Sequence, residues 1–174
     1  ANTLWLDDGR LLASNSDAYG YMTYLGLTAP TWAKRDAPVL VLGAGGASRA
    51  IVYGFLEAGV SRVRVSNRSA ARSDDLVRHF GRRVEACAWE TRSVAARDAG
   101  VIVNTTTLGM KAQGDPDVDF SRVHADTIVS DIVYVPLETS FLAAARRHGL
   151  VTVDGLGMLL HQAVPGFEKW FGVR

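Results

Sequence analysis

The sequence has little cysteine, no long apolar run and almost no net charge, and each shortage excludes a class of protein. Cys87 is the only cysteine among 174 residues, which excludes an internal disulfide framework and a thiolate metal cluster. The four histidines lack metal-ligand spacing, so we expect no metal. Because no apolar run is long enough to span a membrane and a formal charge of +1 forms no basic stripe, we expect neither a membrane nor a nucleic acid as partner. A reducing location, the cytoplasm, is the expected one.

Strands and helices are expected to alternate along most of the chain, which has the length of one domain. Strands are predicted at 39–42, 62–67, 84–89, 101–104, 127–134 and 151–154, and helices after 45 and at 69–79, 91–99, 138–148 and 156–171. A loop at 111–119 holds Gly, Pro and acidic residues and is expected to be exposed. This order predicts an α/β fold: a Rossmann-like, doubly wound parallel sheet with helices on both faces.

The first predicted strand runs into a glycine turn and then into an amphipathic helix. The turn is Gly43-Ala44-Gly45-Gly46-Ala47, followed by Ser48 where the dinucleotide fingerprint has its third glycine. Gly43 permits the tight turn, and Gly45 lets backbone N–H groups approach a pyrophosphate at the positive end of the helix. The alternative is a plain strand-to-helix turn.

The end of the second predicted strand favours NADP over NAD. An NAD enzyme usually carries an acid there for the ribose hydroxyls, whereas this sequence has Asn67-Arg68-Ser69, with Arg72 shortly after. A guanidinium offers a planar fork of donors to a 2′-phosphate and a face for adenine. Ser69 is also expected to cap the next helix. The alternative is that both arginines are solvated charges at a helix start.

Polar or small residues follow five of the six predicted strands, at the positions where ligands bind in doubly wound sheets. They lie at 43–48, 67–69, 104–107, 134 and 154–157. Turn chemistry alone explains any one of these sets, but five on one rim predict a binding site.

The opening residues 2–13 predict a hairpin with its turn at Asp8-Gly9, and a helix is expected to begin within 14–17. Asp17 then lies in the first turn of that helix, where the alternative to a catalytic role is a favourable interaction with the helix dipole. Residues 28–37 are interpreted as a linker.

Seven short motifs, taken in order, resemble the shikimate dehydrogenase family. They are Asn2-Thr3, Asn15-Ser16-Asp17, Gly43 to Arg49, Asn67-Arg68-Ser69, Asn104 to Met110, Asp131 to Pro136 and Asp154 to Gln162. The resemblance covers nearly the whole chain. It implies that 1–27 are the end of an N-terminal α/β substrate-binding domain, 28–37 the linker, and 38–174 an NADP-binding Rossmann domain whose last helix returns toward the substrate.

The resemblance implies reversible, NADP(H)-dependent reduction of 3-dehydroshikimate to shikimate in chorismate and aromatic amino acid biosynthesis. The implied cofactor-binding residues are Gly43, Ala44, Gly45, Gly46, Ala47, Asn67, Arg68, Ser69, Arg72, Asn104, Thr105, Thr106, Ile132 and Gly155. Asn2, Asp17, Tyr134 and Gln162 would bind the small-molecule substrate.

Asp17 matches the family's catalytic aspartate, which works beside a lysine that exchanges a proton with the alcohol oxygen. That lysine belongs to a motif placed before Ala1, and Lys34, Lys111 and Lys169 lie in other contexts. We therefore expect this stretch alone to be inactive. Two alternatives stay open: a noncatalytic NADP-binding module, and a dehydrogenase for quinate or another polyol of the same family. A homodimer through an edge strand is also an expected assembly.

Overall fold

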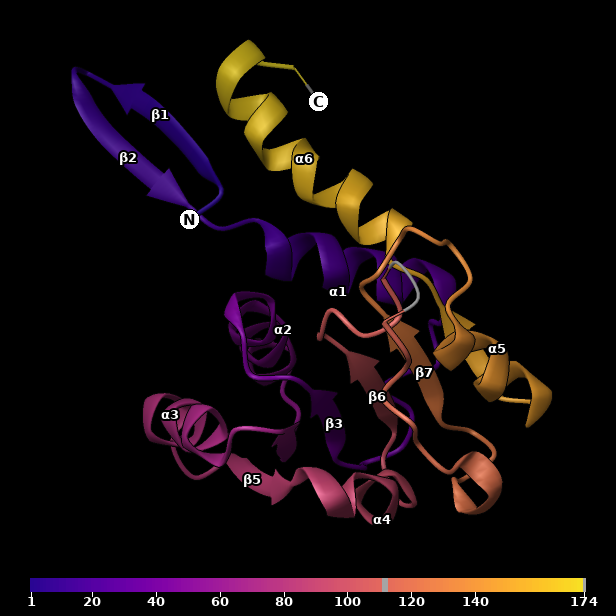
Figure 1. The fold of residues 1–174 in the computed structure, drawn as a ribbon. Helices are drawn as coiled ribbons and strands as arrows, with labels where there is room; N and C mark the ends of the chain where they lie inside the picture. Colours follow the sequence, from indigo (N-terminus) through magenta and orange to yellow (C-terminus); the bar gives the residue numbers. More distant parts are fainter. Residues whose placement is uncertain (111–112, 174) are drawn as a thin grey trace.

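A six-stranded parallel sheet forms the centre of the protein in the computed structural model, which describes residues 1–110 and 113–173 (Figure 1). Its strands are β3 (Val39–Leu42), β4 (Val63–Asn67), β5 (Val84–Ala88), β6 (Val101–Asn104), β7 (Ile128–Asp131) and β8 (Val151–Val153). The order across the sheet is β5-β4-β3-β6-β7-β8. The chain therefore winds outward in two directions from β3, with a switch point between β3 and β6, and the predicted fold class is confirmed.

Helices cover both faces of the sheet. The long ones are α1 (Asp17–Thr28), α2 (Gly46–Glu57), α3 (Ala70–Phe80), α5 (Ser140–Arg147) and α6 (Leu156–Phe171), with a short α4 (Arg92–Ala96) and single 3₁₀ turns η1 (Trp89–Thr91) and η2 (Phe120–Arg122). Along β3, Val39 and Val41 pack against the core beneath α1, α2 and α3, whereas Leu40 and Leu42 pack beneath α4 and α5. All four are buried because a central parallel strand is covered on both sides.

Three local predictions need correction. The strand expected over 127–134 ends at Asp131, because the Asp131 carboxylate accepts the Val133 amide at 2.9 Å and starts a turn. The helix expected over 91–99 is only a 3₁₀ turn followed by α4. Ser69 lies at the N-cap of α3, but its side chain makes no capping hydrogen bond.

The predicted exposed loop is partly buried. Lys111 and Ala112 lie outside the described residues, but Pro116 and Val118 are buried, and Val118 packs into the core beneath α4 and α5. The Arg92 guanidinium donates to the Pro116 carbonyl at 2.5 Å, which fixes the loop against the start of α4. Two buried side chains and one arginine therefore help to hold a segment whose composition predicts exposure.

The predicted hairpin is present as the antiparallel pair β1 (Thr3–Asp7) and β2 (Arg10–Ser14), with Asp8 and Gly9 at positive φ in the turn. Figure 1 shows it projecting beside the second half of α6, away from the sheet. The Trp170 indole of α6 donates to the Leu4 carbonyl at 2.8 Å, which joins the hairpin to the last helix. Among residues 1–110 and 113–173, no helix has the length and apolar character needed to cross a membrane.

Candidate functional site

The glycine turn forms one wall of a cavity of about 210 Å³ at the carboxyl ends of β3, β4 and β6. The residues that line it are Gly43, Ala44, Gly45, Asn67, Arg68, Arg72, Trp89, Thr105, Thr106, Thr107 and Leu108. Eight of these are among the cofactor-binding residues implied by the resemblance, and they come from three motifs that lie far apart along the chain. The structure thus brings three segments to one place: the glycine turn at 43–47, the arginine motif at 67–72 and the threonine loop at 105–108.

Gly43 adopts a φ of 110°, and a Cβ there would lie 2.6 Å from the Thr105 hydroxyl. Position 43 therefore requires glycine both for its backbone conformation and for the close approach of the threonine loop. Around Gly45 and Gly46, by contrast, an added Cβ would have no neighbour within 4 Å. These two positions border open space at the start of α2, which is where backbone N–H groups of a helix can meet an anion.

Ser48 replaces the third fingerprint glycine and has a visible structural role. Its buried hydroxyl accepts the Gly45 amide at 3.0 Å and lies 2.7 Å from the Thr105 hydroxyl. Thr105 in turn donates to the Leu42 carbonyl at 2.7 Å. A chain of three polar groups therefore fixes the glycine turn to the threonine loop across the switch point.

The arginine motif supplies positive charge to the same cavity. Arg68 follows β4, and Arg72 lies in the first turn of α3; both side chains are exposed. Within the described part of the chain, neither guanidinium forms an ion pair with a carboxylate. Two cations beside open space are suited to bind a phosphate group.

Trp89 is a cavity residue that the sequence reasoning missed. It directly follows β5, whose last residue Ala88 lies beside Asn67 in the sheet. The Arg92 guanidinium carbon lies 4.7 Å from the centre of the indole, which is a cation–π contact. The signal in the sequence was an aromatic residue at the carboxyl end of a predicted strand, the position at which the other candidates were selected.

The predicted substrate residues Asn2 and Asp17 are in direct contact. The Asn2 side-chain nitrogen donates to the Asp17 carboxylate at 2.7 Å, and its oxygen accepts the Ser16 amide at 3.0 Å. The start of the hairpin is thereby fixed to the start of α1. Gln162 of α6 lies against Gly20, one turn after Asp17. Tyr134 follows β7 in a turn and is 45% exposed, and no hydrogen bond joins it to the other three within the described residues.

The remaining predicted cofactor residues lie outside the cavity lining. Gly46 and Ala47 begin α2, and Ser69 precedes α3. Ile132 and Gly155 lie together, because a Cβ at Gly155 would be 2.3 Å from the Ile132 carbonyl oxygen. Asn104 is fully buried beneath the threonine loop, so it supports that loop rather than lining the cavity.

Asp131 is a second residue with no role assigned from the sequence. It is fully buried at the end of β7, and burial raises the pKa of its carboxyl group to about 6. Hydrogen bonds from Val133, Thr139 and Asn104 oppose that shift without cancelling it. The signal for Asp131 in the sequence was a carboxylate after an apolar stretch. That stretch forms the strand next to the one that ends in Asn104.

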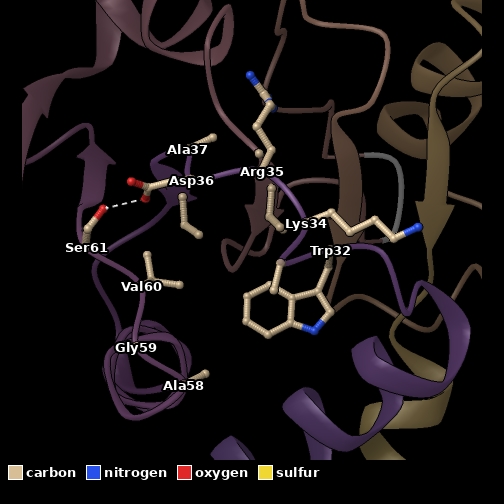
Figure 2. Close-up of a pocket in the computed structure, with 13 residues that line it drawn as sticks. Trp32, Lys34, Arg35, Asp36, Ala37, Ala58, Gly59, Val60 and Ser61 are labelled. Atoms are coloured by element: carbon tan, nitrogen blue, oxygen red, sulfur yellow. Dashed lines mark hydrogen bonds between the residues drawn. The ribbon is translucent and has the colours of Figure 1, made fainter.

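A larger cavity, of about 280 Å³, lies at the opposite edge of the sheet, where β3 and β6 begin (Figure 2). Figure 2 shows a side-chain hydrogen bond there, from Ser61 to Asp36, and the Trp32 ring across from Val60. Parallel α/β sheets bind ligands outside the carboxyl ends of their strands. The smaller cavity with the glycine turn is therefore the candidate site. In the described part of the chain, no group of three His, Cys, Asp or Glu side chains is arranged to hold a metal ion.

The strand order and the glycine turn at the switch point define the class of protein, a Rossmann-type α/β domain. Residues 29–112 match the family model described as shikimate / quinate 5-dehydrogenase, and residues 155–174 match that of the shikimate 5'-dehydrogenase C-terminal domain. The chain belongs to the shikimate / quinate dehydrogenase family, as the seven motifs predicted.

Two relatives are named shikimate dehydrogenase (NADP(+)). The protein from Azorhizobium caulinodans is 56% identical over 173 residues, which cover 99% of this chain and 62% of the relative. The protein from Brucella abortus is 53% identical over 176 residues, covering 99% of this chain and 61% of the relative. The chain thus spans about three fifths of the length of these relatives.

Two solved structures have the same fold. Quinate dehydrogenase from Corynebacterium glutamicum, in complex with NAD, superposes with a TM-score of 0.87 at 30% identity, over 98% of this chain and 62% of that one. Shikimate 5-dehydrogenase from Thermus thermophilus, in complex with NADP(H) and shikimate, superposes with a TM-score of 0.83 at 34% identity, over 98% of this chain and 61% of that one.

Proposed function

We propose that this chain is the NADP(H)-binding part of a shikimate dehydrogenase, which reversibly reduces 3-dehydroshikimate to shikimate. The observation that carries the proposal is the single cavity that joins the glycine turn to Arg68 and Arg72. The names of the two relatives above support NADP rather than NAD. We assign residues 38–174 to the nucleotide-binding domain, 28–37 to the linker and 1–27 to the end of the substrate-binding domain.

The cofactor supplies the hydride, and the residues of this chain bind and orient it. Gly43 to Ala47 hold the pyrophosphate at the start of α2, where open space beside Gly45 and Gly46 fits a phosphate. Arg68 and Arg72, with Asn67 and Ser69 beside them, bind the 2′-phosphate. The threonine loop with Thr105 and Thr106, supported by Asn104, forms the wall beside the ribose. Ile132 and Gly155 lie at the nicotinamide end.

Asn2, Asp17, Gln162 and Tyr134 hydrogen-bond the hydroxyl groups of the substrate. The Asn2 amide already orients the Asp17 carboxylate, which holds a catalytic lysine in position for proton exchange. Neither described lysine lies at this place: Lys34 lines the opposite cavity, and the Lys169 ammonium lies 5.0 Å from the Trp5 ring. Lys111 lies outside the described residues. We therefore propose that the catalytic lysine lies in a segment equivalent to the part of the longer relatives that this chain does not match. We also propose that residues 1–174 alone have no turnover.

A calorimetric titration of this chain with NADP⁺ and with NAD⁺ under matched conditions tests the cofactor assignment. We expect NADP⁺ to bind at least about tenfold more tightly, since charge-assisted hydrogen bonds to a phosphate supply that difference. Equal affinity for both would contradict the role of the arginine motif. Lack of binding by either would contradict the assignment of the cavity.

A quinate dehydrogenase is the second candidate function, favoured by the structural similarity to the Corynebacterium enzyme. The structure of that enzyme is a complex with NAD. NAD enzymes usually carry an acid after the second strand, whereas the residue that follows Arg68 in this chain is Ser69, which is not an acid. Turnover of shikimate and quinate by the longer protein, each with NADP⁺, separates the two functions. Equal or faster turnover of quinate would overturn the assignment to shikimate. The pairing of Asn2 with Asp17 disfavours a noncatalytic NADP-binding module, which needs no substrate residues.

A further inference from the structure

Three fully buried polar side chains, those of Asn104, Asp131 and Thr139, lie together at the carboxyl ends of β6 and β7. Asn104 and Asp131 end their strands side by side in register, and Thr139 is the N-cap of α5. A buried carboxylate is costly unless hydrogen bonds satisfy it. Asp131 therefore needs a reason to lie here, and none of the roles above supplies one.

The Asp131 carboxylate joins three separate segments. One oxygen accepts from the Asn104 side-chain nitrogen at 3.0 Å and from the Val133 amide at 2.9 Å. The other accepts from the Thr139 hydroxyl at 2.8 Å. The same hydroxyl accepts the Leu142 amide at 3.3 Å at the start of α5. The β6 loop, the turn after β7 and the start of α5 are thus held by a single group.

The bond to Asn104 determines which way the Asn104 amide faces. An ionised carboxylate only accepts, so the nitrogen of Asn104 faces Asp131, and it also donates to the Leu108 carbonyl at 3.0 Å. The Asn104 oxygen is left to accept the amide and the hydroxyl of Thr106, at 3.0 and 2.7 Å. The loop from Thr105 to Leu108, which lines the cavity, is folded around this oriented amide.

We infer that Asp131 is a positioning residue for the cofactor site, which sets the threonine-loop wall through Asn104 and the Ile132–Tyr134 turn through the Val133 amide. The inference rests on the proposed function, because it assigns the cavity to NADP(H). Asp131 lines no part of the cavity and so acts only through these neighbours.

The arrangement depends on the charge of Asp131. Protonation turns one of its acceptors into a donor, so at least one of the three hydrogen bonds must break or reverse. The groups that face the carboxyl from β6, from the turn and from α5 are Asn104, Val133 and Thr139, all of them neutral. Burial raises the pKa of Asp131 to about 6, so the ordered form prevails above that pH and is lost below it.

The first test needs no cofactor. In ¹⁵N spectra of this chain, the Asn104 side-chain amide and the Thr106 and Val133 backbone amides should shift together as the pH is raised from well below to well above the Asp131 pKa, with one midpoint near pH 6. The Asp131→Asn variant, which is neutral at every pH, should show none of this common transition. Separate midpoints in the wild type, or a transition that persists in the variant, would overturn the network.

The second test measures NADP⁺ affinity over the same pH range. At about pH 7.5, Asp131→Asn should bind several-fold more weakly than the wild type, and Asp131→Ala about tenfold more weakly, because the loop loses its oriented amide. Toward about pH 5 the wild type should approach the Asn variant, since most of its Asp131 is then protonated. The cofactor's own 2′-phosphate titrates in this range, but it does so equally for both proteins.

Val84→Ala is the matched control, since it removes part of a buried side chain at the start of β5, a strand that β4 and β3 separate from β6 and β7. It should lose stability without a change in affinity or in its pH profile. If the wild type binds NADP⁺ and Asp131→Asn binds it with the same affinity, the positioning role is overturned and the proposed function stands. A wild type that binds no NADP⁺ at neutral pH would overturn both.

Discussion

Gly20 in α1 lies so close to Gln162 in α6 that a Cβ at position 20 would be 2.6 Å from the Gln162 backbone nitrogen and 2.7 Å from the Met158 carbonyl oxygen. Gly157 repeats this close approach, because its Cβ would be 2.1 Å from the Tyr24 ring. The two helices cross here, and at each of these two places one helix has a glycine, which leaves no side chain to hold the other helix away. This crossing sets the position of Gln162 relative to Asp17, one turn before Gly20.

Gly20→Ala should destabilise the fold by about 1 to 3 kcal/mol, because the neighbouring atoms are backbone atoms and the Gln162 Cβ, which no change of rotamer moves away from the methyl group. The free energy of unfolding in urea is the measurement. Gly26→Ala in the same helix is the control: its Cβ meets nothing within 4 Å, so it should stabilise by about 0.5 to 1 kcal/mol. Similar effects of the two substitutions would show that the helix crossing does not depend on Gly20.

Arg68→Ala should weaken NADP⁺ binding by about 10- to 100-fold and leave NAD⁺ binding unchanged, since only NADP⁺ carries the 2′-phosphate. Calorimetric titration of both cofactors measures the difference. Arg78→Ala is the control, because Arg78 lies in the last turn of α3 and pairs with Asp75. An equal loss for the two cofactors would mean that Arg68 does not contact the 2′-phosphate.

Trp89 should report cofactor binding through its fluorescence, because it is the one tryptophan that lines the cavity of the glycine turn. Of the other three, Trp32 lines the opposite cavity, and Trp5 and Trp170 lie at the hairpin. We expect NADP⁺ to quench the wild type and Trp170→Phe alike, and to leave Trp89→Phe almost unaffected. Full quenching in Trp89→Phe would place the cofactor elsewhere.

The free energy of unfolding should decrease as the pH rises from about 4 to about 6, because of Asp131. Its pKa is raised from 3.8 to about 6 in the folded state, so the folded protein binds a proton that the unfolded chain releases in this window. The corresponding stability is fully present below about pH 4 and is lost as the pH rises through 6, by about 3 kcal/mol. Denaturant unfolding of the wild type relative to Asp131→Asn at each pH measures it. A difference that is constant with pH would contradict the raised pKa.

Asp17→Asn in the longer protein should lower turnover by about 10²- to 10⁴-fold, the usual range for lost acid–base assistance, with little change in NADP⁺ affinity. Steady-state kinetics with shikimate, together with a cofactor titration, separate the two effects. Asp7→Asn, at the turn end of the hairpin, is the control for removing a negative charge as such. Unchanged turnover would show that Asp17 has no catalytic role and only interacts with the helix dipole at the start of α1.

Local patterns in the sequence predicted most of the fold. Four apolar residues before Gly43 are typical of a buried parallel strand, and Asp8-Gly9 is typical of a hairpin turn. Such signals lie within a few residues of one another, so they need no knowledge of the rest of the chain. Where the predictions were wrong, at Asp131, at Ser69 and in the loop before Phe120, a side chain's hydrogen bonds or a tertiary contact decided the local conformation.

By itself, the sequence determined the α/β class, the order of the elements, the family and the three motifs that line the cavity. Only the tertiary structure decided that Trp89 joins those motifs, that Asn104 supports the cavity from beneath, and that Asp131 holds three segments with one buried carboxylate. The physical reason is the distance along the chain over which each kind of interaction acts. Turn, strand and helix preferences act between neighbours in the chain, whereas burial, raised pKa values and side-chain networks arise only when distant segments exclude water together.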